Sequence, residues 1–123
     1  MRTIIAGSRG ISDVRLVKEA VEKSDFLITE IVSGHARGVD KAGERYAESA
    51  DIDLVIFPAN WNKHGYSAGH IRNERMARYA IADESRPGGL IAIWDGVSRG
   101  TKNMIDTANR LGLKVFIFRI DAE

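Results

Sequence analysis

The sequence of 123 residues contains no cysteine, and this absence removes two kinds of structure. Without thiols the chain forms no disulfide and offers no thiolate to a metal ion. The absence also fits a reducing compartment, and we expect the protein to be cytoplasmic. An excess of one charge is lacking as well, because 18 Lys and Arg face 17 Asp and Glu, for a net charge of +1. This balance gives no general reason to expect a polyanionic partner, although a local basic rim is compatible with it.

Long apolar runs are missing too. The N-terminal segment "MRTIIAGSRG" becomes apolar at once but reaches glycine at residue 7. A membrane span needs about 20 apolar residues, so we expect neither a signal peptide nor a membrane partner. The chain also contains no repeat, linker or low-complexity tract. Its 44% hydrophobic and 28% charged residues are typical of a globular protein, and we predict a single domain over residues 1–123.

Apolar runs alternate with amphipathic segments along the chain, which predicts strands alternating with helices. Strands are expected at residues 2–6, 28–33, 53–58, 90–94 and 113–118. Helices are expected at about 13–23, 39–50, 68–82 and 101–111. Ser12 is the expected N-cap of the first helix, and Gly112 the residue that ends the last one. This alternation predicts a doubly wound α/β fold: a parallel five-stranded sheet with helices on both faces, in the expected order 3-2-1-4-5.

Three of the expected strands end in polar loops that contain glycine: "GSRG" at 7–10, "SGHARGVD" at 33–40 and "DGVSRGT" at 95–101. Each loop leads into a helix, whose N-terminus offers free N–H groups and a partial positive charge. In the expected strand order, these three loops meet where the order reverses, which is where doubly wound sheets bind ligands. A single loop of this kind is more often an ordinary turn than a phosphate site, and none of the three matches the dinucleotide fingerprint or the P-loop. Their convergence predicts a ligand with an anionic group.

Four segments, taken in order, resemble the SLOG superfamily: "GSR", "SGHARGVD", "PANWNKHGYSAGHIRNERM" and "IAIWDGVSRGT". This group includes the DprA proteins and the LOG phosphoribohydrolases, and the stand-alone YspA-like proteins are the most similar branch. The resemblance covers roughly residues 2–118. It implies a Rossmann-like domain that binds a nucleotide or a nucleotide-derived ligand, such as a nucleoside phosphate or an ADP-ribose or NAD-type compound. It also implies a homodimer, and no further cofactor is expected.

The expected ligand-binding residues lie in these four segments. They are Gly7, Ser8, Arg9, Ser33, Gly34, His35, Arg37, Gly38, Asp40, Trp61, Arg72, Asn73, Asp95, Gly96, Ser98, Gly100 and Thr101. The guanidinium groups of Arg9, Arg37 and Arg72 suit phosphate, although an arginine is more often a solvated surface residue. Asp40 is a candidate for a ribose hydroxyl or another loop, and serves equally well as an acidic residue near a helix N-terminus. Trp61, in a polar loop, is the candidate for stacking on a base.

Whether the ligand is cleaved stays open at the sequence level. The LOG enzymes have an arginine in a segment that "RNERM" resembles, and a glutamate after a glycine-rich loop. In this chain the arginine corresponds to Arg72, but Met104 stands at the glutamate position, and a thioether can neither take a proton nor stabilise a developing cation. Arg72, Glu74 and Asp95 are the catalytic candidates, and Asp40 or Glu44 is another possible source of a carboxylate. N-glycosidic hydrolysis is therefore an alternative to binding alone.

A single-stranded nucleic-acid module is the third alternative. The segment "SGHARGVD" is similar to a phosphate-facing loop of DprA. Binding a strand needs several phosphate contacts along a basic groove, and this chain has no additional basic segment. Nucleic acid is therefore not the expected partner. The three histidines show no metal-ligand spacing with Asp or Glu, so no metal site is predicted.

Overall fold

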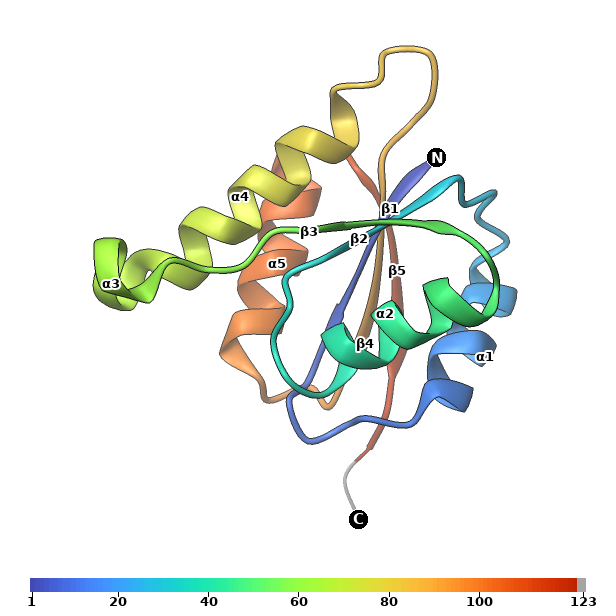
Figure 1. Cartoon of the computed structure of the whole chain (residues 1–123), viewed down its shortest axis with the longest axis horizontal. Coiled ribbons are helices and arrows are strands. Elements are labelled where there is room, and N and C mark those ends of the chain that lie inside the picture. Colours follow the sequence, from blue (N-terminus) through green and yellow to red (C-terminus); the bar gives the residue numbers. More distant parts are fainter. Residues whose placement is uncertain (122–123) are drawn as a thin grey trace.

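The computed structural model describes residues 1–121 as a three-layer α/β/α domain (Figure 1). The strands are β1 (Arg2–Gly7), β2 (Glu30–Ser33), β3 (Asp53–Ile56), β4 (Gly89–Trp94) and β5 (Lys114–Arg119). The helices are α1 (Val14–Ser24), α2 (Val39–Ser49), α3 (Trp61–His64), the 3₁₀ turn η1 (Gly65–Ser67), α4 (Ala68–Ile81) and α5 (Arg99–Arg110). The longest helix, α4, has 14 residues, and none within residues 1–121 is long and apolar enough to cross a membrane.

The five strands form one parallel sheet in the order β3-β2-β1-β4-β5, as predicted. Strand β1 lies at the centre, where Ile4 pairs with Val32 of β2 on one side and with Leu90 of β4 on the other. Helices α1 and α2 cover one face of the sheet, and α4 and α5 cover the other (Figure 1). The strand order reverses between β1 and β4, so the loops after these strands diverge to opposite faces.

The core consists of two layers, one on each face of the sheet. Ile4 and Leu90 pack with α4 and α5, whereas Ile5 and Ile91 pack with α1 and α2. Side chains alternate between the faces of a strand, so a strand that is covered on both faces must be apolar throughout. This explains the uninterrupted apolar sequences of β1 and β4, which made these strands predictable.

Several element boundaries differ from the predicted ones. Asp13, not Ser12, is the N-cap of α1, and its carboxylate accepts a hydrogen bond from the Arg15 N–H. Helix α5 begins at Arg99, two residues earlier than expected, and β3 ends at Ile56, before Pro58. Gly112 follows α5 with a φ of +85°, a conformation that glycine adopts without strain, which confirms its predicted role.

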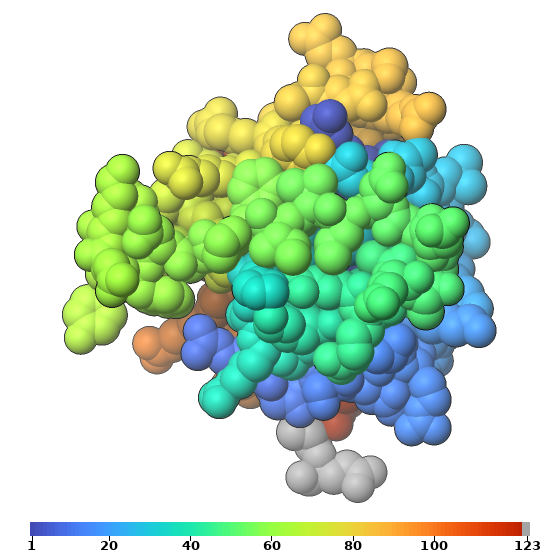
Figure 2. Space-filling view, in the orientation of Figure 1, coloured from blue at the N-terminus to red at the C-terminus, as the bar shows by residue number. Residues whose placement is uncertain are grey.

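The segment between β3 and α4 was expected to be a loop and instead contains α3 and η1. Asn60 begins α3, and its side chain accepts a hydrogen bond from the Lys63 N–H. The two short turns project from the body of the domain (Figures 1 and 2). They carry Trp61, whose surface is 51% exposed, and the fully exposed Tyr66. A helix of four residues is too short to show a periodic pattern, which explains why the sequence did not reveal it.

Candidate functional site

A cleft follows the edge of the sheet at which β1, β2 and β4 end. Its inner part, here called the inner cavity, has a volume of about 280 Å³. The inner cavity is lined by Ala6, Gly7, Arg9, Ala36, Asp40, Arg72, Asn73, Met76, Ser98, Gly100, Thr101 and Met104. Its outer part, the outer cleft, has a volume of about 550 Å³. The outer cleft is lined by Arg9, Gly34, His35, Ala36, Arg37, Pro58, Ala59, Trp61 and Arg72.

The loop after β1 lies between the other two loops and holds them together. The carbonyl of Ser8 accepts a hydrogen bond from the Val39 N–H, at the start of α2. The hydroxyl of Ser8 accepts one from the Asp95 N–H, at the end of β4. Gly38 has a φ of +82°, and a Cβ there would lie 2.5 Å from the carbonyl oxygens of Ser8 and Arg9. Only glycine permits this close approach, so Gly38 shapes the site by bringing two loops together.

The N-terminus of α5 points free backbone donors at the inner cavity. The carboxylate of Asp95 accepts hydrogen bonds of 2.8 Å from the N–H groups of Val97 and Ser98. The next three N–H groups, of Arg99, Gly100 and Thr101, find no hydrogen-bond partner within residues 1–121. Unpaired N–H groups in the first turn of a helix, together with the helix dipole, form a ready site for an anion.

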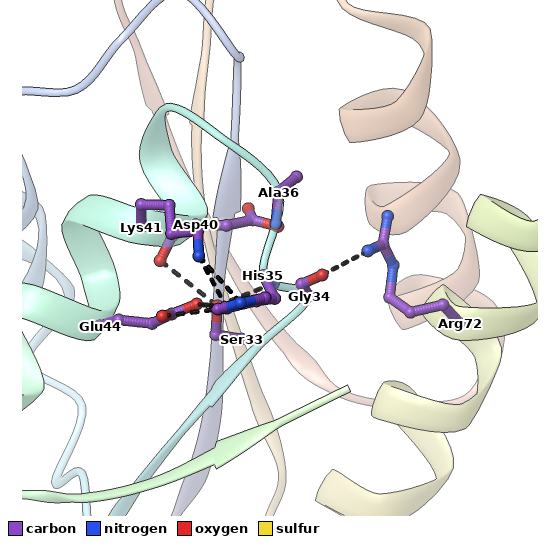
Figure 3. Close-up of polar contacts among 8 residues, drawn as sticks. All are labelled: Ser33, Gly34, His35, Ala36, Asp40, Lys41, Glu44 and Arg72. Atoms are coloured by element: carbon purple, nitrogen blue, oxygen red, sulfur yellow. Dashed lines mark hydrogen bonds and ion pairs between the residues drawn. The ribbon is translucent and has the colours of Figure 1, made fainter. Parts of the chain in front are cut away.

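Helix α4 ties the loop after β2 to the start of α5. Arg72 donates a hydrogen bond of 2.6 Å to the carbonyl of Gly34 (Figure 3). It donates a second, of 2.9 Å, to the side chain of Asn73. The buried side-chain amide of Asn73 donates in turn to Asn103, at 2.9 Å, and to the carbonyl of Gly100, at 3.4 Å. Arg72 is half-buried, and loss of solvent lowers the pKa of its guanidinium, while the nearby Asp40 raises it. The guanidinium lines both the inner cavity and the outer cleft.

Asp40 is a buried carboxylate in the inner cavity, with only 5% of its surface exposed. It accepts a hydrogen bond of 3.2 Å from the Ala36 N–H. Burial raises the pKa of Asp40 to about 6, while the Ala36 N–H, the charge of Arg72 and the Gly7 N–H lower it. A Cβ at Gly34 would lie 2.8 Å from the Arg72 guanidinium and 2.9 Å from the Asp40 carboxylate. The absence of a side chain at Gly34 thus lets these two opposite charges approach each other.

The backbone between β2 and α2 is held by a cluster of polar side chains (Figure 3). His35 has a φ of +63°, which is unusual for a residue other than glycine. Glu44, on α2, accepts a hydrogen bond of 2.8 Å from Ser33 and lies 2.9 Å from Nδ1 of His35. Nζ of Lys41 lies 2.9 Å from Nε2 of the same ring. These contacts hold the loop in the conformation that presents Gly34 and Ala36 to the cleft.

The first 64 residues match the family model described as the YspA, cpYpsA-related SLOG family. The chain belongs to this family. It is also 32% identical, over 126 aligned positions, to the Gene 61 protein of Mycobacterium phage D29, and the match covers 95% of each chain. No solved structure matches the chain. The family assignment confirms the resemblance recognised in the sequence.

The structure of this SLOG protein brings most of the predicted site residues together. Those that line the inner cavity are Gly7, Arg9, Asp40, Arg72, Asn73, Ser98, Gly100 and Thr101. Those that line only the outer cleft are Gly34, His35, Arg37 and Trp61. Trp94 packs against the core beside α4 and α5, and its indole donates to the carbonyl of Ser98.

The other predicted residues lie behind this surface. Ser8, Ser33 and Gly38 hold the loops through the contacts described above. Gly96 has a φ of +83° and faces the guanidinium of Arg119 on β5, so close that a Cβ would lie 2.2 Å from it. Asp95 bonds the backbone that leads into α5, which lowers the pKa of its carboxyl. These residues shape the site and line neither the inner cavity nor the outer cleft.

Glu74, one of the catalytic candidates, also lies outside the inner cavity and the outer cleft. It is on the outer face of α4, where its carboxylate contacts Arg110 at 2.8 Å and Arg78 at 3.5 Å. The buried positions of α4 are Ala68, Asn73, Met76, Ala77 and Ala80, and the last four follow helical spacing. Successive residues of a helix point about 100° apart, so the residue after Asn73 turns away from the cavity. This periodicity is visible in the sequence, and it predicts that Glu74 lies on the outer face of α4.

Sequence reasoning missed the apolar residues that line the inner cavity: Ala6, Ala36, Met76 and Met104. The sequence comparison places Met104 where the LOG enzymes have a glutamate but does not reveal that it is a core residue, 1% exposed. Apolar residues at helical spacing give no signal that separates a cavity wall from an ordinary core position. Within residues 1–121 no group of three His, Cys, Asp or Glu side chains is arranged to hold a metal ion.

Proposed function

We propose that this SLOG protein binds a nucleotide or a nucleotide-derived ligand in the cleft formed by the inner cavity and the outer cleft. The observation that carries this proposal is the convergence of anion-binding groups on the inner cavity. Gly100 and Thr101, whose N–H groups have no partner within residues 1–121, line this cavity together with Arg9 and Arg72. Backbone donors at a helix N-terminus and guanidinium groups both recognise phosphate.

The outer cleft supplies a place for the base. Trp61 is half exposed, and its indole lines the outer cleft together with Arg37 and Arg72. An exposed indole beside cationic groups is suited to stack on a base whose phosphate lies further in. The phosphate therefore belongs at the start of α5 and the base at Trp61, with the sugar between them.

Binding without cleavage is the function that the residues support best. The position at which the LOG enzymes have a catalytic glutamate is occupied by Met104, which is buried in the core. Of the other carboxylates considered, Asp95 and Glu74 lie outside the cleft, and Glu44 is engaged by Ser33 and His35. Asp40 lines the inner cavity, where its carboxylate accepts a hydrogen bond from the Ala36 N–H. A ligand-binding role needs no catalytic carboxylate.

Calorimetric titration tests this proposal directly. The purified protein would be titrated with adenosine monophosphate, ADP, ADP-ribose, NAD and inorganic phosphate, and small molecules released on denaturation would be identified by mass spectrometry. We expect one or more of the nucleotides to bind more tightly than inorganic phosphate, because only a nucleotide reaches both parts of the cleft. Absence of binding to all four nucleotides, with none released on denaturation, would contradict the proposal.

A further inference from the structure

We propose that Asp40 selects ligands that carry a sugar hydroxyl beside the phosphate, by accepting a hydrogen bond from that hydroxyl. This inference rests on the proposed function and names the class of nucleotide that the site prefers, namely ribonucleotides. It makes Asp40 a residue that determines specificity and contacts the ligand.

Asp40 has unused capacity to accept hydrogen bonds, and it faces the inner cavity. An ionised carboxylate can accept about four hydrogen bonds, whereas within residues 1–121 the side chain of Asp40 accepts one of 3.2 Å from the Ala36 N–H to Oδ2 and interacts with one further backbone donor, the Gly7 N–H. No buried side-chain oxygen or nitrogen in this part of the chain lacks a partner. Oδ1 of Asp40 makes no hydrogen bond to another side chain, so it is not a buried, unpaired atom but is accessible. Asp40 lines the inner cavity, and a ligand would reach Oδ1 from there.

The charge around Asp40 decides what the ligand must present to it. At neutral pH the carboxylate is mostly ionised, since its pKa is about 6. Two charged groups face Asp40: Arg72 from α4 and Glu44 from α2. A third, Arg9 on the loop after β1, lines the same cavity and acts on Arg72. An ionised carboxylate repels phosphate, so the phosphate belongs at the opposite wall, where α5 begins. The part of the ligand that faces Asp40 must then donate a hydrogen bond.

The position of Asp40 favours a sugar hydroxyl as this donor. Among residues 1–121, Asp40 is the one carboxylate that lines the inner cavity, and none lines the outer cleft. Gly100 and Thr101, in the first turn of α5, line the same cavity, whereas Trp61 lines only the outer cleft. A nucleotide with its phosphate at α5 and its base at Trp61 places the sugar in between, beside Asp40. The alternative donor is an amino group of the base, which would require the base to occupy the inner cavity instead.

The test compares ligands that differ by one donor group. Adenosine monophosphate, its 2′-deoxy and 3′-deoxy analogues and inosine monophosphate would be titrated into the wild type and Asp40→Asn. Asp53→Asn is the matched control, because Asp53 is exposed at the start of β3, at the opposite edge of the sheet. We expect the wild type and the control to bind adenosine monophosphate at least tenfold more tightly than one of the deoxy analogues. In Asp40→Asn this ratio should fall to about threefold or less, because a hydrogen bond to a charged group is stronger than one to a neutral amide.

The pH dependence gives a second measurement that needs no variant. Below pH 6 the carboxylate of Asp40 takes up a proton, and its preference for the hydroxyl should weaken in the wild type. A purely structural role of Asp40 would leave the ratio between the two ligands independent of pH. Circular dichroism would establish that Asp40→Asn is folded, and the pH series on the wild type decides the question if it is not.

The possible failures are distinguishable. If none of the four ligands binds the wild type, the proposed function fails for these nucleotides and this inference fails with it. If adenosine monophosphate and both deoxy analogues bind the wild type equally, the inference fails and the proposed function stands. A strong preference for adenosine over inosine monophosphate that depends on Asp40, without discrimination between the sugars, would assign the carboxylate to the base and overturn the inference.

Discussion

Gly100 is the residue at which the proposed anion site can be blocked most cleanly. It lies in the first turn of α5 and lines the inner cavity, and a Cβ at this position would meet no atom within 4 Å. The substitution Gly100→Val therefore adds bulk where we place the phosphate, without disturbing the fold. We expect it to weaken nucleotide binding at least tenfold, about 1.4 kcal/mol. Titration calorimetry with adenosine monophosphate or ADP-ribose measures this change.

Gly10→Val is the matched control for this substitution. Gly10 is exposed, is the last residue of the loop after β1 and lines neither part of the cleft, and a Cβ there also meets no atom within 4 Å. Both variants should unfold at temperatures close to that of the wild type, and Gly10→Val should keep its affinity. Full affinity in a folded Gly100→Val protein would show that the phosphate does not bind at the start of α5.

Asp40 also links the stability of the ligand-free protein to pH. Its folded pKa, about 6, lies above the ordinary value of 3.8, so the folded state binds the proton more tightly than the unfolded chain. The resulting stabilisation of the folded state is complete below about pH 4 and is lost as the pH rises through about 6. Between these two limits the contribution of Asp40 to the free energy of unfolding falls by about 3 kcal/mol. Asp40→Asn carries no such charge. We expect the melting temperature of the variant, relative to that of the wild type, to increase as the pH rises from 4 to 7.5.

This prediction is checked by thermal unfolding of both proteins over that range, without nucleotide. Other carboxyl groups titrate in both proteins, so their effects cancel in the difference between the two melting temperatures. A difference that stays constant from pH 4 to 7.5 would show that the folded environment does not raise the pKa of Asp40.

At the scale of the elements, the sequence predicted the strands that are covered on both faces, because their apolar character is continuous. Strand β4 begins one residue before the predicted start and ends at the predicted Trp94. Strand β3 lies at an edge of the sheet, and its apolar sequence predicted two more residues than it contains. The short helix α3 depends on a single side-chain contact of Asn60 with the backbone, which periodicity cannot reveal.

The candidate site was predictable to the extent that it depends on the ends of strands. Parallel strands end at one edge of a sheet, so the strand order alone brings the loops after β1, β2 and β4 together. Which side chains line the cavity depends on contacts between elements. Asp95 bonds the backbone that leads into α5 instead of facing the cleft, and Glu44 bonds His35. No local pattern in the sequence distinguishes these uses of a carboxylate from a catalytic one.

For the whole molecule, the absence of a carboxylate at position 104 bears on the reaction that this SLOG protein can support. Met104 is buried, and its thioether can neither accept a proton nor stabilise a developing cation. We therefore expect little or no free base when the protein is incubated with nucleoside monophosphates, as measured by liquid chromatography. Rapid release of base by the wild type that disappears in Asp40→Asn would show instead that Asp40, which lines the inner cavity, serves as the catalytic carboxylate. Loss of release on substitution of Asp95 or Glu74 would likewise contradict a binding role alone.

The distribution of charge over the molecule separates a nucleotide site from a nucleic-acid groove. Three arginines line the inner cavity and the outer cleft: Arg9, Arg37 and Arg72. The net charge of the chain is only +1. Each phosphate that a protein neutralises on a single strand contributes about −0.7 to the slope of log affinity against log salt. With room for one or a few phosphates, we expect weak oligonucleotide binding at physiological salt, with a slope no steeper than about −2.

This binding should also be independent of length, because one terminal nucleotide fills the cleft and the rest of the strand lies in solvent. Fluorescence anisotropy with labelled oligonucleotides of increasing length measures both properties, and adenosine monophosphate or ADP-ribose should compete the oligonucleotide away. Gly100→Val provides the internal control, since it should weaken the mononucleotide and the oligonucleotide alike. A groove would behave differently: affinity would rise with each added nucleotide, the salt dependence would steepen, and a mononucleotide would compete poorly. That result would show that a nucleic-acid strand binds along the surface of the domain, and it would contradict the cleft as the ligand site.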